Sequence, residues 1–307
     1  MTEFQHTSYA CSVTIWNPKK PTIMRSFTLV IALLLFSITS LFAQGWKAGI
    51  AGGTAAYLGD LQEDIWHQES LHPSIGIFGS YYFKDIIGLR GQLTIAHVAA
   101  DDALANDAWR RQRNLSFRSD IYEAALLAEI DLTGMWPSLW IHPYAYIGVA
   151  GFYFNPQAQY NGQWHDLQPL GTEGQGTSIY PNRQPYSRFE MAFPLGAGLR
   201  FDVGRNWQVG VGVMYRKTFT DYLDDVSMTY PDMQVLRAEN GDLAAALSDR
   251  TGEVVPDAST RQMGDQRGNA QAMDTYLTGS IVLIRRLGKN VKPDDVYGVQ
   301  FGCPGKF

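Results

Sequence analysis

The sequence has little cysteine, no strong excess of charge and none of the common catalytic motifs. With only 2 Cys residues, and with histidines that lack the close pairing of a zinc site, it offers no thiolate or imidazole cluster for a metal. A formal net charge of −5 provides no basic surface for nucleic acid. No glycine-rich run opens a helix, and no G-x-S-x-G nucleophile elbow occurs. The sequence therefore predicts no enzyme, no metal or other cofactor and no nucleic-acid partner.

The residues that are abundant favour strands beside a membrane. Hydrophobic residues make up 45% of the chain, and it contains 16 Tyr, 8 Trp and 30 Gly. Aromatic side chains suit the two interfaces of a bilayer, and glycine fits a crowded lumen.

An export signal is predicted at the N-terminus. Residues 25–43 (RSFTLVIALLLFSITSLFA) have a basic start, a short apolar core and a small residue at Ala43, where a signal peptidase could cut. The uninterrupted core is too short for the roughly 20 residues of a membrane-spanning helix. We expect residues 1–43 to be an N-terminal extension and signal peptide, with the true start at Met24. Their removal leaves Cys303 as the only thiol.

Segments of alternating polarity recur along the rest of the chain. In 187–203 every second side chain is apolar, from Phe189 through Leu195 to Val203, and small or charged residues lie between them. This period of two is typical of a strand with one oily face. Counting the weaker examples, the sequence predicts eight strands, at 46–57, 72–83, 86–98, 119–132, 142–154, 187–203, 206–219 and 274–285.

The connections between these segments distinguish a membrane barrel from a soluble β-sandwich, which would also alternate. Short and long connections alternate strictly, as in a barrel with tight periplasmic turns and long external loops. Residues 44–285 are therefore predicted to form an all-β domain, an eight-stranded antiparallel transmembrane β-barrel in the outer membrane. Two aromatic belts are expected: Trp46, Phe83, Trp136, Trp140 and Trp207 at the periplasmic end, and Tyr57, Tyr122, Tyr153, Phe189, Tyr215 and Tyr276 at the outer end.

Charged residues on the inward faces predict a filled lumen. An eight-stranded barrel encloses only enough room for its own side chains. Buried charges persist when they are paired, so we interpret the inward charges as an ion-pair plug and not as a selective channel. The plug is predicted to comprise Arg90, Glu123, Glu129, Glu190, Arg200, Asp202 and Arg216.

Two further patterns leave alternatives open. The segment Asp221–Ser227 (DYLDDVS) brings three carboxylates together, which suits calcium or a solvated or partner-facing acidic loop around Asp224. In the same loop, Leu243–Leu247 (LAAAL) predicts one or two helical turns. Ser80, His97 and Glu123 could be combined into a lipid hydrolase on the barrel, although nothing in their spacing favours it.

Several segments together resemble a known family. They are Tyr57–Leu61 (YLGDL), Arg113–Glu123 (RNLSFRSDIYE), Thr220–Ser227 (TDYLDDVS) and Gln266–Asn269 (QRGN). With them the chain resembles the PorG-type outer-membrane barrels of the Bacteroidetes type IX secretion system. The resemblance implies a non-enzymatic component that anchors a periplasmic ring of PorK-type lipoprotein and PorN-type protein, with a role in protein secretion and gliding motility. The alternative is a stand-alone barrel, acting as an adhesin or a lipid-modifying enzyme.

The last segment, 286–307, is expected to be a periplasmic C-terminal tail. It is too polar for the bilayer, yet Tyr297, Val299 and Phe301 are apolar and alternate just before Cys303. We expect the tail to dock on a periplasmic partner. An unpaired thiol in an oxidising compartment predicts a mixed disulfide through Cys303, for which the family resemblance nominates the ring lipoprotein.

Overall fold

The computed structural model describes residues 45–62, 70–83, 86–135, 141–204, 206–256 and 261–287. The predicted signal segment lies outside these residues. So do the residues of the tail to which a role was assigned, Tyr297, Val299, Phe301 and Cys303. What the sequence predicts for them stays a prediction.

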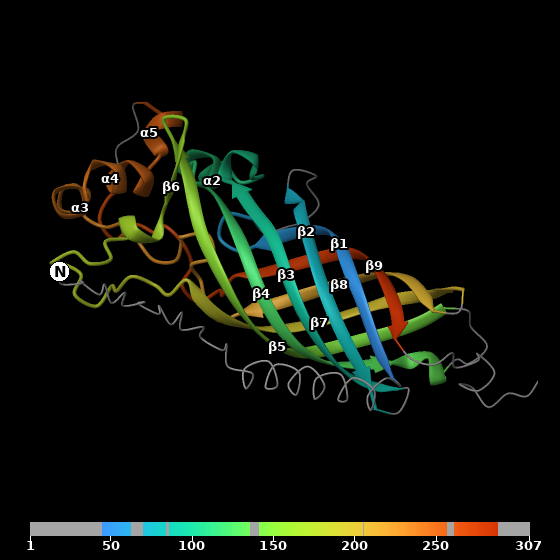
Figure 1. The fold of residues 1–307 in the computed structure, drawn as a ribbon. Helices are drawn as coiled ribbons and strands as arrows, with labels where there is room; N and C mark the ends of the chain where they lie inside the picture. The colour runs from blue at the N-terminus through green and yellow to red at the C-terminus, as the bar shows by residue number, and fades with distance from the viewer. Residues whose placement is uncertain are drawn as a thin grey trace, which may run out of the picture. The chain divides into compact units, whose positions relative to one another are not determined.

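Eight long strands form the wall of a closed barrel (Figure 1). They are β1 (Trp46–Leu58), β2 (His72–Tyr82), β3 (Ile87–Asp101), β4 (Ser116–Asp131), β5 (Ile141–Tyr160), β7 (Phe189–Val203), β8 (Trp207–Thr218) and β9 (Thr275–Leu287). All pairings are antiparallel in the order β4-β3-β2-β1-β9-β8-β7-β5, and the pairing of β4 with β5 completes the ring. The predicted eight-stranded antiparallel barrel is confirmed.

The two faces of the wall are inverted relative to a soluble protein. Leu195, near the middle of β7, leaves 55% of its surface exposed on the outside, whereas Arg200 on the same strand is 1% exposed and faces the lumen. The same alternation holds in β3, β4 and β8, whose burial switches at nearly every residue. An apolar exterior around a polar interior matches a lipid environment.

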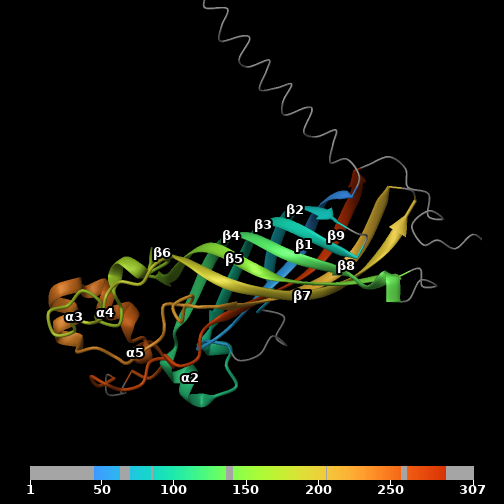
Figure 2. The same ribbon diagram turned by 90° about the horizontal axis from the view of Figure 1, so that it is seen from below.

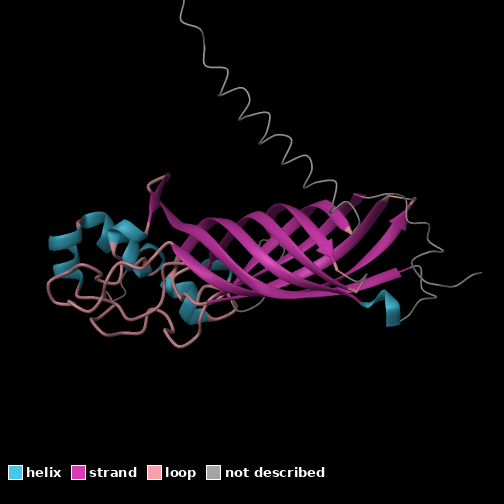
Figure 3. Cartoon of the chain, turned by 60° about the horizontal axis from the view of Figure 1, so that its bottom comes forward, coloured by secondary structure: helices cyan, strands magenta, loops and turns pink. Residues whose placement is uncertain are grey.

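Three strands are longer than their apolar alternation predicts. β3 and β4 remain paired out to Asp101 and Ser116, and β5 continues to Tyr160, where it pairs with the short strand β6 (Gln163–Asp166). Figure 3 shows strands of the barrel running on toward the end where most of the helices lie. Backbone pairing needs no apolar side chain, so strands continue beyond the lipid where the polarity pattern fades.

The aromatic belts are partly as predicted. Exposed rings lie at both ends of the strands: Trp46, Phe83 and Trp207 at the end with short turns, and Tyr122, Tyr153, Phe189 and Tyr215 at the other. The assignment of Tyr57 and Tyr276 to the outer belt is wrong, because both side chains are 0% exposed and bond to carboxylates inside the protein. Trp136 and Trp140 lie outside the described residues.

The long loops form a layer of their own at the outer end of the barrel. They contain η2 (Asp102–Leu104), α2 (Ala108–Arg113), η4 (Gln168–Leu170), α3 (Met233–Asn240), α4 (Asp242–Ser248) and α5 (Thr251–Val254), whereas η3 (Leu132–Met135) follows β4 at the opposite end. Figures 1 and 2 both place α2 to α5 at this outer end. The helical turns predicted at 243–247 are confirmed as α4. No helix in the described ranges has the length and apolarity needed to cross a membrane.

The outward position of Leu195 generates a stability prediction. Replacing it with Arg places a charge near the bilayer midplane, so Leu195→Arg should lower the free energy of unfolding by roughly 2–4 kcal/mol. Ile179→Arg, in an exposed loop, is the control and should change it by about 0.5 kcal/mol or less. Urea titration of the protein in lipid vesicles, followed by heat-modifiable gel migration, measures both. Equal, small effects of the two substitutions would contradict a lipid-facing β7.

Candidate functional site: a charged lumen closed by the outer loops

A bidentate ion pair between an arginine and a glutamate fills the outer half of the lumen. Arg216 of β8 donates from Nε and Nη2 to the two carboxylate oxygens of Glu123 on β4, at 2.9 and 3.0 Å. Tyr276 of β9 donates its hydroxyl hydrogen to the same carboxylate at 2.7 Å, and Thr278 accepts from Arg216 Nη1. Such a bidentate, fully hydrogen-bonded pair satisfies both charges where water is excluded.

A second group of charges fills the half nearer the short turns. Arg200 Nη1 lies 2.9 Å from Glu129 Oε1 and its Nη2 lies 3.1 Å from Asp131 Oδ2. Arg90 reaches the other oxygen of Glu129 at 3.7 Å, and Tyr82 donates to Glu129 at 2.6 Å. The planes of the two guanidinium groups cover aromatic rings, with Arg90 centred 3.4 Å over Phe78 and Arg200 4.3 Å over Tyr144.

Two residues assigned to the plug do not belong to these buried groups. Glu190 lies next to the outer end of β7, is only half-buried, and forms no ion pair among the residues described. Asp202 lies at the opposite end of β7, with 39% of its side chain exposed, where it pairs with His142 and Arg286. Both residues lie on the inward-facing side of β7, as predicted, but they are at the strand ends, which lie beyond the enclosed part of the lumen.

The lumen between the two ion-pair groups is nearly full. A cavity there, lined in part by Gln92, Tyr144 and Thr278, has a volume of about 20 Å³. That is room for about one water molecule.

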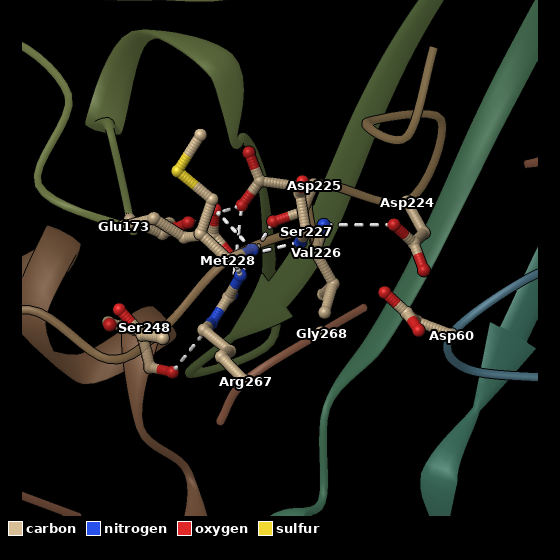
Figure 4. Close-up of polar contacts among 12 residues, drawn as sticks. Asp60, Glu173, Asp224, Asp225, Val226, Ser227, Met228, Ser248, Arg267 and Gly268 are labelled. Atoms are coloured by element: carbon tan, nitrogen blue, oxygen red, sulfur yellow. Dashed lines mark hydrogen bonds and ion pairs between the residues drawn. The ribbon is translucent and has the colours of Figure 1, made fainter. Parts of the chain in front are cut away.

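Two buried arginines tie the four long loops together at the outer mouth. Arg267 donates from Nη1 to Glu173 at 3.0 Å and to the backbone oxygen of Asp225 at 2.6 Å. Arg113 donates to both oxygens of Asp102, at 2.6 and 2.7 Å, and to the backbone oxygens of Asp60 and Arg267. Part of this arrangement is drawn in Figure 4. We call it the outer loop network, comprising Tyr57, Asp60, Asp102, Arg113, Glu173, Asp224, Asp225, Arg267 and Asp274.

Glu173 and Asp225 complete the surroundings of Arg267. Glu173 is fully buried and accepts from the backbone nitrogens of Ser227 and Met228 at 2.9 and 3.0 Å. Asp225 accepts from Tyr186 at 2.8 Å. Burial raises the pKa of Asp225 to about 6, against the opposing charge of Arg267.

A second buried pair of carboxylates shares the hydroxyl of Tyr57. Its oxygen lies 2.5 Å from Asp224 and 2.9 Å from Asp274, which are 1% and 0% exposed. One hydroxyl hydrogen cannot be donated to both carboxylates, and this arrangement favours the protonated form of one of them. Burial raises the pKa of both carboxyls well above the usual value. The charges of Asp60 and Asp221 raise the pKa of Asp224 further, and those of Asp224 and Asp221 raise the pKa of Asp274.

The acidic segment Asp221–Ser227 is therefore not a solvated or partner-facing loop. Asp221, Asp224 and Asp225 are all at most 5% exposed. The interpretation was wrong because Arg267, which pairs with Asp225 of this segment, lies some forty positions farther along the chain. Within the described ranges no three His, Cys, Asp or Glu side chains are placed to hold a metal ion.

The segments on which the family resemblance rests meet in this network. Tyr57 and Asp60 come from the first, Arg113 from the second, Asp224 and Asp225 from the third and Arg267 from the fourth. Glu173, Asp102 and Asp274 were missed, since isolated loop carboxylates carry no sequence signal.

The three residues considered for a hydrolase do not meet. Ser80 donates to Glu129 inside the lumen at 3.1 Å, and Glu123 is held there by Arg216. His97 faces outward and contacts Asp120 at 2.7 Å.

Comparison with known proteins agrees with the barrel geometry. The model of the outer membrane protein beta-barrel domain family matches residues 28–238, more than half of the chain. The chain belongs to this family. Membership of this family places the protein in the outer membrane. No curated protein sequence matches the chain.

Several solved barrels are similar in fold. Neisserial surface protein A has 9% identity and a TM-score of 0.38, with 79% of this chain and 97% of that chain covered. Ail of Yersinia pestis has 10% identity and a TM-score of 0.33, covering 78% and 97%. The outer membrane enzyme PagL has 11% identity and a TM-score of 0.29, covering 77% and 98%. At these levels the similarity concerns the fold alone.

The filled lumen predicts that the protein does not conduct ions steadily. In planar bilayers the wild-type protein should show no large, stable channel, because charged pairs and aromatic rings occupy the interior. Single-channel recording checks this, with a known porin as the positive control. Reproducible openings that disappear in Arg200→Ala would show that the inner charges select ions instead of filling space.

The buried carboxyls predict a loop layer that loosens as the pH rises. Burial raises the pKa of Asp221 from 3.8 to about 8. In an opened loop this carboxyl ionises near its usual value. The closed loop is therefore favoured most below about pH 4. It loses this advantage as the pH rises toward 8, and Asp224 and Asp274 act in the same direction.

Amide hydrogen exchange at pH 5 and pH 9, corrected for intrinsic rates, measures the effect. Protection of residues 221–227 should fall at pH 9, and Asp221→Asn should reduce the difference. Asp242→Asn, at an exposed carboxylate paired with Arg237, is the control and should leave it unchanged. Protection that is constant or greater at pH 9 would contradict the assigned direction.

Proposed function

We propose that the protein is a non-enzymatic outer-membrane component of the type IX protein secretion machinery, and that it anchors a periplasmic ring complex. The proposal starts from the resemblance to PorG-type barrels. The observation that supports it most strongly is that the four sequence segments shared with PorG-type barrels all contribute residues to the outer loop network. Residues scattered from Tyr57 to Arg267 along the chain form one buried network. The segments that resemble PorG-type barrels therefore belong to a single three-dimensional feature of this protein.

The filled barrel supports a holding role instead of a conducting one. Arg216 with Glu123, and Arg200 with Glu129, occupy the lumen, while the loops cover its outer mouth. A secreted chain has no path through such an interior. In this proposal the barrel fixes a point in the membrane to which periplasmic proteins attach.

The periplasmic attachment is assigned to the tail that follows β9. Its apolar residues Tyr297, Val299 and Phe301 provide the docking surface, and Cys303 forms a disulfide with the ring lipoprotein of the PorK type. A PorN-type protein completes the ring. β9 ends at Leu287 beside the first residues of β1, at the end of the barrel that carries the short turns. Leu287, the last described residue before the tail, therefore lies at the end of the barrel where the proposed ring would attach.

Affinity purification from cell envelopes tests the proposal. Tagged wild-type protein should copurify with a periplasmic lipoprotein, and part of this complex should migrate as a high-mass band on non-reducing gels. Cys303→Ser should remove that band yet retain most copurification, whereas deletion of residues 288–307 should remove both. Arg237→Gln, at an exposed ion pair in an outer loop, is the control and should change neither.

The same experiment addresses the alternative of a stand-alone adhesin or lipid-modifying barrel. If no periplasmic protein copurifies with the wild type, while heat-modifiable migration shows that the barrel is folded, the anchoring role is wrong. Identical bands in wild type and Cys303→Ser would remove only the disulfide from the proposal.

A further inference from the structure

Two cavities lie on the outward face of the same pair of strands. The outer cavity, of about 730 Å³, is lined by His97 and Ala99 of β3, Ser116 and Arg118 of β4, Trp164 of β6 and Arg110 of α2, among others. The apolar groove, of about 430 Å³, is lined mainly by Gly91 and Leu93 of β3, Ala124 and Leu126 of β4, Gly151 of β5 and Met191 of β7. Figure 1 shows β3, β4 and β5 side by side, with α2 and β6 at their outer ends.

Strand parity makes the two cavities parts of one surface. Gly91, Leu93, His97 and Ala99 are alternate residues of β3 and so share its outward face. From Gly91 to His97 the strand advances about 20 Å at roughly 3.4 Å per residue. With a strand tilt of about 40° this corresponds to a depth of roughly 15 Å. That is half of a hydrocarbon core of about 30 Å, so the groove lies where the acyl chain of an outer-leaflet lipid would end.

The outer cavity has a cation whose charge is not balanced by a carboxylate among the described residues. The guanidinium of Arg118 lies 3.5 Å over the ring of Trp164 and donates from Nε and Nη2 to Gln157 Oε1, at 3.2 and 3.1 Å. Asp101 and Asp107, which also line the cavity, accept from the backbone nitrogens of Ala103 and Trp109. Asp120, two residues from Arg118 on the same face of β4, contacts His97 Nδ1 at 2.7 Å. Arginine placed in this way suits a phosphate group.

The size and lining of the outer cavity point to sugars beside the phosphate. Its volume falls within the roughly 300–1,000 Å³ of sites that enclose organic ligands. Asn106, Ser116 and Gln159 supply amide and hydroxyl groups that can bond to sugar hydroxyls. A phosphate with a small alcohol would leave most of this space empty.

The geometry points to a site for one phosphorylated glycolipid of the outer leaflet. We propose that lipopolysaccharide binds here, with a headgroup phosphate on Arg118, its sugars in the outer cavity and one acyl chain in the apolar groove. Because the long loops mark the external side, the lipid comes from the outer leaflet. The inference rests on the membrane barrel and is independent of any secretion partner.

Binding of lipopolysaccharide to the purified, delipidated protein in detergent tests the site. Native mass spectrometry should show one molecule per barrel for the wild type. Arg118→Gln removes the phosphate contact, and Gly91→Leu fills the groove. A Cβ at Gly91 meets no atom within 4 Å, so this substitution leaves the wall intact. Each variant should bind at least about tenfold more weakly, a loss of about 1.4 kcal/mol.

Matched controls separate the site from the general lipid shell. Gly52 is also an outward strand glycine with open space around it, and Arg237 is an exposed arginine on α3. Gly52→Leu and Arg237→Gln should bind like the wild type, and all variants should retain heat-modifiable migration. Equal binding by every variant would overturn the proposal. Equally tight, equally Arg118-dependent binding of phosphatidylglycerol would overturn the assignment to a glycolipid. If Gly91→Leu fails to fold, Ala124→Leu fills the same groove and decides the question.

Discussion

The rest of the structure depends on the neutralisation of arginine side chains that are buried away from water. An unpaired charge in such a place costs several kcal/mol, so each guanidinium must have a carboxylate and further hydrogen-bond acceptors within reach. Arg216 meets Glu123 inside the barrel, and Arg267 meets Glu173 among the loops. The strands bring the first pair together by parity and register. The second pair forms only when two loops fold back over the mouth, so the closed mouth and the pairing of Arg267 require each other.

The barrel and its loop layer are thus stabilised in different ways. In the wall, lipid around the apolar face and the backbone ladder fix each strand, and the lumen charges fit into a frame that is already set. Among the described residues of the mouth, no strand ladder joins one loop to another, and Arg113 and Arg267 reach the backbone oxygens of neighbouring loops. Burial also favours the protonated forms of Asp224 and Asp274, which lowers the charge buried among the loops. The loop layer should therefore respond to pH and substitution more sharply than the wall.

The strands of the barrel wall could be predicted from the sequence, whereas the contacts among the loops at the mouth could not. Lipid imposes a strict alternation, so β7 and the inward positions of Arg200 and Arg216 could be predicted from polarity alone. Tyr57 and Tyr276 were misassigned because an aromatic ring at a strand end suits either the membrane interface or the lumen. Asp224 and Asp225 were taken for a solvated loop because charge density is local, whereas Arg267, which pairs with Asp225, is distant in sequence. The family resemblance marked both the acidic segment and the segment that contains Arg267, but it did not reveal that they touch.

The most direct test of the account is a double-mutant cycle on Arg267 and Glu173. The measured quantity is the free energy of loop opening, from hydrogen exchange of the amides of Ser227 and Met228, which bond to Glu173. Arg267→Met and Glu173→Gln should each weaken the closed state strongly, by about 3–5 kcal/mol. Because each single change leaves the other group unpaired, the double variant should lose much less than the sum, with a coupling of at least about 2 kcal/mol. Additive losses, or undiminished protection in either single variant, would contradict the claim that this pair holds the mouth closed.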